Sequence, residues 1–131
     1  MKINTENLPY TISPKLIILL EKLTDDLDGV GITVNFRDPT YSAKFGGYHP
    51  VEIRISSNGE IEFITDFAYV GLGQDAELVK EIDFDFSCGI FGHVYCPDKP
   101  IEVGYHLYSI WEMNFLSYVE MDIFTVTISE D

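Results

Sequence analysis

Leucines spaced along one face of an α-helix dominate residues 13–28. Ser13 is a favoured helix N-cap, and Pro14 suits the first helical position, where its missing N–H costs nothing. Gly29 follows as a left-handed stop signal. The pattern therefore predicts a deeply packed helix that ends just before Gly29. Its apolar face consists of Leu16, Leu20, Leu23 and Leu27.

Alternation of apolar and polar residues predicts strands over 32–37 and 51–55, and a third that starts at Ile61 and runs on to Gly71 and Gly73. Between the last two, residues 57–59 read as a three-residue turn with Gly59 in the left-handed bulge position. This turn would place Ile55 opposite Ile61 and Ile53 opposite Phe63. It would also place Arg54 across from Glu62 on the outer face of the sheet.

A fourth strand is predicted over 77–86, because apolar and acidic residues alternate there. Residues 87–99 either extend this strand through Ile90 or form a loop. A second helix is expected from near Pro100, with Asp98 as its cap. Alternation returns from Tyr118 to Ser129 and predicts a last strand. In the second helix, residues at helical spacing are Val103, Leu107, Ile110, Trp111 and Asn114. Trp111 and Phe115 of this helix are expected in the core.

These elements indicate an α+β fold with a curled antiparallel sheet of about five strands and two helices, in the order α-β-β-β-β-α-β. A chain of 131 residues is expected to form a single domain, 1–131. Its hydrophobic fraction of 46% is enough to build a core, which excludes a disordered chain.

Charge changes this picture, because 22 Asp and Glu face only 8 Lys and Arg, for a net charge of -14. Such a surface repels nucleic acid and anionic membranes, and it favours a basic partner, cations or solubility alone. No apolar run is long enough to cross a bilayer, and the start has no signal-peptide pattern. We therefore expect a cytoplasmic protein with reduced Cys88 and Cys96. No basic residue follows Lys99 to pair the acids beyond it: Glu102, Glu112, Glu120, Asp122, Glu130 and Asp131.

Two places could hold a binding surface. One is an acidic stripe on the fourth strand, made of Glu81, Asp83 and Asp85, with Asp66 and Glu62 beside it on the neighbouring strand. This stripe is either a cation or docking site or the solvated face of a half-buried sheet.

The second place is the long loop 39–50. It carries Tyr41, Lys44, Phe45, Tyr48 and His49, and loops of this length are often functional. His49 could act as a general base near Asp66. The alternative is that Phe45 and Tyr48 only fold back over the edge of the sheet.

Recognised catalytic motifs are absent, so no catalytic residue, cofactor or metal site is assigned. Cys88, His93, Cys96 and His106 have ligand types that suit zinc, but their spacing matches no standard structural site. Neither cysteine lies in a recognisable nucleophile signature.

Four segments carry a resemblance to one known family. The sequence resembles a small family of proteins from marine and enteric γ-proteobacteria, catalogued as a domain of unknown function and also found on mobile genetic elements. The resemblance covers roughly residues 45 to 129 and implies no activity. The segments are Gly47–Ile53, Ile64–Gly71, Leu78–Phe86 and Trp111–Phe115.

Three functions stay open at this stage. The first is a non-enzymatic acidic protein that binds a basic protein partner, for example as a mimic of nucleic acid. The second is a small-molecule or metal-dependent enzyme with a pocket near the loop 39–50. The third is a homodimeric structural or accessory protein.

Overall fold

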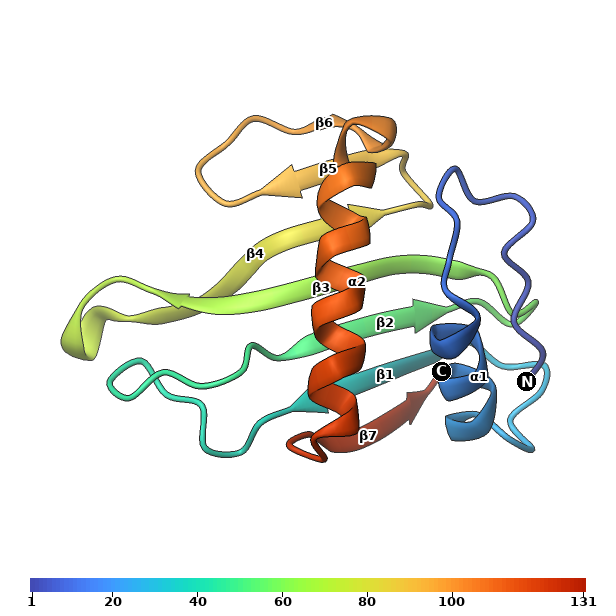
Figure 1. Ribbon diagram of the computed structural model, residues 1–131, viewed down its shortest axis with the longest axis horizontal. Coiled ribbons are helices and arrows are strands. Elements are labelled where there is room, and N and C mark those ends of the chain that lie inside the picture. The colour runs from blue at the N-terminus through green and yellow to red at the C-terminus, as the bar shows by residue number, and fades with distance from the viewer.

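The computed structural model describes all 131 residues as an open seven-stranded antiparallel sheet with two α-helices. Neighbouring strands follow the order β6-β5-β4-β3-β2-β1-β7 (Figure 1). Two short 3₁₀ helices, η1 (Gly73–Asp75) and η2 (Ile101–Gly104), join longer elements. Those elements are α1 (Pro14–Leu23), β1 (Ile32–Arg37), β2 (Val51–Ile55), β3 (Ile61–Val70), β4 (Glu77–Asp85), β5 (Ile90–His93), β6 (Lys99–Pro100), α2 (Tyr105–Glu120) and β7 (Thr125–Glu130).

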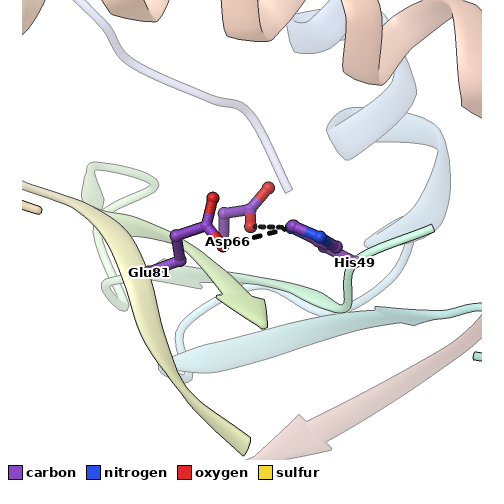
Figure 2. A group of neighbouring side chains, drawn as sticks. All are labelled: His49, Asp66 and Glu81. Atoms are coloured by element: carbon purple, nitrogen blue, oxygen red, sulfur yellow. Dashed lines mark hydrogen bonds and ion pairs between the residues drawn. The ribbon is translucent and has the colours of Figure 1, made fainter. Parts of the chain in front are cut away.

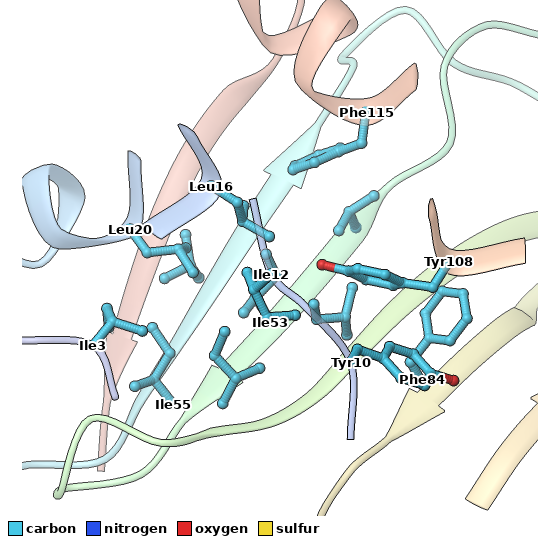
Figure 3. Close-up of a cluster of buried hydrophobic side chains, with 14 of the residues drawn as sticks. Ile3, Tyr10, Ile12, Leu16, Leu20, Ile53, Ile55, Phe84, Tyr108 and Phe115 are labelled. Carbon is cyan, nitrogen blue, oxygen red and sulfur yellow. The ribbon is translucent and has the colours of Figure 1, made fainter. Parts of the chain in front are cut away.

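Both helices pack on the same face of the sheet, and α2 crosses the strands while α1 lies near the ends of β1 and β2 (Figure 1). The hydrophobic core lies between these layers. It is formed by alternate strand residues, by Leu16 and Leu20 of α1, and by Tyr108 and Phe115 of α2 (Figure 3). The predicted α+β class is therefore confirmed. The predicted count of about five strands is too low, because β5 and β6 were not foreseen.

The first helix begins as predicted but ends earlier. The Ser13 hydroxyl accepts a hydrogen bond from the backbone N–H of Lys15, and Pro14 opens the helix. The helix stops at Leu23, because Thr24 leaves helical geometry, with φ -108° and ψ 20°, and Asp26 takes a left-handed φ of 65°. The predicted stop at Gly29 is therefore wrong by more than a turn.

The hairpin between β2 and β3 has the predicted turn but a different register. Ile55 pairs with Ile61, and Gly59 has a φ of 80°. Beyond this pair the register shifts, so that Ile53 lies opposite Ile64 instead of the predicted Phe63. Glu62 is the extra residue of this β-bulge, and it still forms the expected ion pair with Arg54, at 3.3 Å.

A second register shift separates β3 from β4. Asp66 pairs with Ile82, whereas the next residue of β3, Phe67, pairs with Lys80, so Glu81 is the extra residue. The predicted inward face of β4 is confirmed for Ile82 and Phe84, which are buried. The prediction that Glu81 shares a face with Asp83 and Asp85 is wrong, because the bulge re-aims its side chain.

The C-terminal third differs most from the prediction. The second helix is preceded by η2, and Asp98 does not cap it. It continues to Glu120, so Tyr118 belongs to the helix and not to the last strand, which begins at Thr125. Val103 and Ile110 of the predicted apolar face are exposed. The residues that this helix buries are Tyr108, Trp111, Glu112 and Phe115.

Several acids of the C-terminal third have partners that the sequence did not indicate. Arg54 forms two hydrogen bonds with the carboxylate of Asp131, and Lys15 lies 3.9 Å from Glu120. The buried Glu112 accepts hydrogen bonds from the Tyr108 hydroxyl and from a backbone N–H. The expectation that these acids lack basic partners is therefore wrong in part.

Neither helix combines the length and the apolar character needed to span a membrane.

Candidate functional site

A cavity of about 400 Å³ lies between α2, the segment that leads into β2, and the bulged parts of β3 and β4. Leu107, Ile110 and Asn114 come from the predicted helix face, which therefore lines the cavity as well as packing on the core through Trp111. Nine of the fourteen lining residues are hydrophobic. The lining consists of Gly47, Tyr48, His49, Val51, Asp66, Glu81, Ile82, Leu107, Ile110, Trp111, Asn114, Phe115, Tyr118 and Phe124.

The loop that brings His49 to this cavity is anchored by Asp38. The Asp38 carboxylate accepts hydrogen bonds from the backbone N–H groups of Tyr48 and Thr40 and from the Thr40 hydroxyl. These donors, the Tyr48 N–H first, lower the pKa of Asp38. The loop closes tightly at Gly47, which has a φ of 137° and where a Cβ would lie 2.9 Å from the Cα of Tyr41.

His49 is held on two sides. Its ring stacks on Tyr41 with centroids 5.4 Å apart, and the Tyr41 hydroxyl in turn accepts a hydrogen bond from the backbone N–H of Tyr69. Nδ1 of His49 lies 2.8 Å from Oδ1 of Asp66 (Figure 2). The other oxygen of Asp66 accepts a 2.9 Å hydrogen bond from the indole N–H of Trp111. Asp66 therefore holds His49 and Trp111 in fixed orientations.

Glu81 completes the polar group at the cavity. Its Oε2 lies 3.9 Å from Nδ1 of His49, on the same side as Asp66 (Figure 2). The pKa of His49 is raised, first by the hydrogen bond with Asp66 and also by the negative charges of Asp66 and Glu81, while burial opposes the shift. The site thus combines one imidazole with two carboxylates.

Five of the nine predicted site residues come together here, since Tyr41 and Tyr48 join the three polar residues. The other four lie elsewhere. Lys44 and Phe45 are exposed in the loop, so the idea that Phe45 folds back over the sheet is wrong. Asp83 and Asp85 lie on the face of the sheet away from the helices, where Asp83 accepts a hydrogen bond from the Thr65 hydroxyl.

The four residues whose types would suit zinc do not form a site, in line with their spacing in the sequence. Cys88, His93, Cys96 and His106 are exposed, and both cysteines are free. His49, Asp66 and Glu81 form the one group of three or more His, Cys, Asp or Glu residues whose ligand atoms come within 4.8 Å of one another.

The sequence did not reveal the helix side of the cavity. Trp111 was correctly assigned to the core, but its indole N–H also binds a site carboxylate. Tyr118 was placed in a strand, and Asn114 was placed on the helix face without a link to a site. The available signal was their spacing of three and four residues, which puts all three on one side of a helix once the helix is known to reach Glu120.

The lining limits the chemistry of the cavity. It contains no Lys or Arg, and the one side chain that can become cationic, His49, already faces two carboxylates, so the cavity does not favour an anionic ligand. It also contains no Ser, Thr or Cys that His49 could activate as a nucleophile. An oriented imidazole, two carboxylates and several aromatic rings can bind a polar group that is attached to an apolar body.

Comparisons with known proteins agree on one family. No curated protein matches the chain. Two similar solved structures are hypothetical proteins from Vibrio cholerae. One, from the VSP-II pathogenicity island, is 42% identical with a TM-score of 0.78, over 92% of this chain and 98% of the other. The second, from pathogenicity island VPI-2, is 38% identical with a TM-score of 0.76, over 95% and 98%, and is reported to share structural homology with the human P32 protein.

The family profile described as "Protein of unknown function (DUF2787)" matches residues 13–129. This match includes α1, so it extends further toward the N-terminus than the resemblance seen in the sequence. It covers most of the chain, and the chain therefore belongs to the DUF2787 family.

Proposed function

We propose that the protein binds a small organic molecule in the cavity between α2 and the sheet. The observation that carries this proposal is a cavity of about 400 Å³ with an apolar lining and one cluster of oriented polar groups. Ligand sites typically have volumes of roughly 300–1,000 Å³ and combine mainly apolar walls with a few fixed polar groups.

The ligand is uncharged or cationic and has an apolar body. Asp66 and Glu81 place negative charge at one end of the cavity, and no Lys or Arg in the lining offsets it. Aromatic rings of Trp111, Phe115 and Tyr118 line the helix side and suit a flat or branched apolar group. A cationic group would also gain from these rings.

Binding is better supported than acyl transfer. His49 is oriented by Asp66 in the way that a general base is oriented in hydrolases, but the lining offers no hydroxyl or thiol nucleophile beside it. The hydrogen-bonded imidazole therefore serves to recognise a polar group of the ligand.

Three probes with the same phenyl body test this proposal: phenethylamine, 2-phenylethanol and phenylacetate. The chain has a single tryptophan, Trp111, and it lines the cavity, so its fluorescence reports occupancy. We expect the amine and the alcohol to change this fluorescence saturably and the anion to have no effect.

Two variants of α2 provide the control. Ile110→Arg places bulk and positive charge in the cavity and should abolish the response. Met113→Arg makes the same change on an exposed part of the helix outside the cavity lining and should preserve it. Equal responses of both variants, or no response of the wild type to any probe, would contradict the proposal.

A second candidate is docking of a basic protein on the face of the sheet opposite the helices. It is supported by the acidic group around Asp83, whose pKa is raised by burial first and further by the charges of Asp85 and Asp98. A cationic partner would relieve this repulsion. We expect salt-sensitive capture of a basic protein that is lost in Asp83→Asn/Asp85→Asn and kept in Ile110→Arg. Capture that the double variant leaves intact would reject this candidate.

We also infer a cytoplasmic location. Cys88 and Cys96 are exposed and free, which fits a reducing compartment. A membrane-permeant maleimide should label both thiols in intact cells, whereas an impermeant one should label them only after lysis. Labelling of intact cells by the impermeant reagent would contradict this location.

A further inference from the structure

Glu81 reaches the cavity only because of the bulge in β4. Regular alternation would direct it to the outer face with Asp83. The bulge brings it instead to the side of Asp66 and His49 (Figure 2). Its carboxylate accepts no hydrogen bond from the chain, and the nearest nitrogen of a basic side chain is Nδ1 of His49, at 3.9 Å. A backbone irregularity thus directs a partly buried carboxylate to a place where the protein gives it no hydrogen-bonding partner.

The ligand atoms of the three side chains lie within 4.8 Å of one another, near the spacing of a cation site. Metal–ligand bonds of about 2.0–2.2 Å, at angles of 90–110°, separate adjacent ligand atoms by roughly 3.0–3.5 Å. Nδ1 of His49 lies 2.8 Å from Oδ1 of Asp66 and 3.9 Å from Oε2 of Glu81. Rotation of Glu81, whose side chain is 29% exposed, would bring the longer distance into this range.

Neighbouring side chains fix the orientation of two of the three residues, Asp66 and His49. The indole N–H of Trp111 binds the second oxygen of Asp66 and leaves Oδ1 directed at His49. Tyr41 stacks on the imidazole ring and limits its rotation. Such supporting contacts orient metal ligands in proteins, and their loss commonly costs 10–100-fold in metal affinity.

We propose that His49, Asp66 and Glu81 bind a divalent transition-metal ion at the cavity. One imidazole and two carboxylates suit Zn²⁺, Co²⁺, Mn²⁺ or Fe²⁺ better than Ca²⁺ or Mg²⁺, which prefer oxygen ligands alone. His49 would coordinate through Nδ1, with its proton on Nε2. Three protein ligands leave at least one coordination position open toward the cavity. This inference goes beyond the proposed function, because the ion needs no organic ligand to bind.

Calorimetric titration of the metal-free 131-residue chain with Zn²⁺ tests the proposal. We expect one ion per chain in the wild type and at least a tenfold loss of affinity in Glu81→Gln and in His49→Gln. Asp83→Asn is the matched control, because it removes a carboxylate from the same strand on the opposite face, and its affinity should equal that of the wild type. Circular dichroism verifies that each variant is folded.

Co²⁺ provides the second measurement, because its visible spectrum reports the ligands. Absorption from nitrogen and oxygen ligands that disappears in Glu81→Gln supports the site. Thiolate-to-cobalt absorption would place the ion on Cys88 or Cys96 and overturn the proposal, as would the absence of stoichiometric binding or equal affinity in Glu81→Gln and the wild type.

The metal site and the organic ligand site can fail separately. Ile110→Phe adds bulk to the cavity without charge and keeps all three proposed metal ligands, so it should retain metal affinity while losing the response to phenethylamine. Suppose that the Glu81 and His49 variants lose metal affinity, but neither the wild type nor any variant binds a probe. This result would reject the proposed organic ligand site and support the metal site.

Discussion

Asp66→Asn is the sharpest test of how the site is held together. Asp66 accepts one hydrogen bond from His49 and one from Trp111, and it is 8% exposed. Asparagine has nearly the same shape but offers one acceptor oxygen and one donor amide. When His49 is protonated, it and Trp111 both need an acceptor, and only one of them can find it.

The size of the effect depends on the protonation of His49. With protonated His49, a buried donor stays unpaired, at about 1–3 kcal/mol, and the remaining bond changes from charged to neutral, at about 1 kcal/mol. The imidazole is 36% exposed, so solvent screens its share, and we expect a total loss of about 3 kcal/mol. With neutral His49, Nδ1 can accept from the amide, and only about 1 kcal/mol is lost.

These free energies translate into melting temperatures. Unfolding entropy of about 2.1 cal/mol/K per residue gives roughly 0.28 kcal/mol/K for 131 residues. The variant should therefore melt about 10 °C below the wild type at pH 5.5 and about 4 °C below it at pH 8.5. The loss is larger at pH 5.5 than at pH 8.5 because the pKa of His49 is raised in the folded state. The bond between protonated His49 and Asp66 therefore stabilises the fold fully below the unfolded pKa of about 6.5, and this contribution is lost as the pH rises through the folded pKa.

Thermal unfolding at both pH values measures the stability effect, and NMR titration of the histidine rings measures the pKa directly. Chelator in the buffer keeps the site metal-free. We expect the pKa of His49 to fall in Asp66→Asn and to stay unchanged in Asp83→Asn, which alters a carboxylate on the far face. An unchanged pKa of His49 in Asp66→Asn, or an equal loss of melting temperature at both pH values, would refute the reasoning.

Three further predictions concern the frame around the site. Tyr108→Phe removes a buried hydroxyl that donates to a carboxylate one turn later, and should cost about 1.5–3 kcal/mol in urea unfolding, whereas the exposed Tyr95→Phe should cost nothing. Gly59→Ala should destabilise more than Gly29→Ala, because both have positive φ but only at Gly59 would a Cβ meet the backbone of the N-terminal segment. Asp38→Asn should flatten the fall in stability between pH 5 and 3, because the lowered pKa of Asp38 stabilises the fold above the unfolded value of about 3.9 and that contribution is lost on acidification. Equal acid sensitivity of Asp38→Asn and the wild type would contradict this last prediction.

The sequence predicted the elements that depend on local signals. The Ser13 cap, the alternating strands β1 and β2, and the left-handed Gly59 turn follow from side-chain chemistry within a few residues. The end of α1 was not predicted, because the chain takes its left-handed turn at Asp26, ahead of the Gly29 that the local pattern indicated. Strands β5 and β6 were missed since they are two to four residues long and mostly exposed.

The site itself was predicted in pieces. His49 beside Asp66 was foreseen from residue types alone, as a possible base and its neighbour. Trp111 was not, because a tryptophan on a helix fits a core as well as a cavity wall, and only its indole N–H distinguishes the two. Residue type thus indicated which side chains could do chemistry, but not the face on which each would lie.

The faces are set by the two β-bulges, and each bulge contains a glutamate. If β2 and β3 paired the same sequence without a bulge at Glu62, Ile53 would pair with Phe63 and Asp66 would point to the outer face, away from Trp111. Without the extra Glu81, β4 would carry no carboxylate on the cavity side. Because the side-chain period of a strand is two, each single-residue insertion moves the later residues of its strand to the opposite face, and the two insertions bring both carboxylates to His49. The polar site therefore depends on two register shifts that strict alternation cannot reveal.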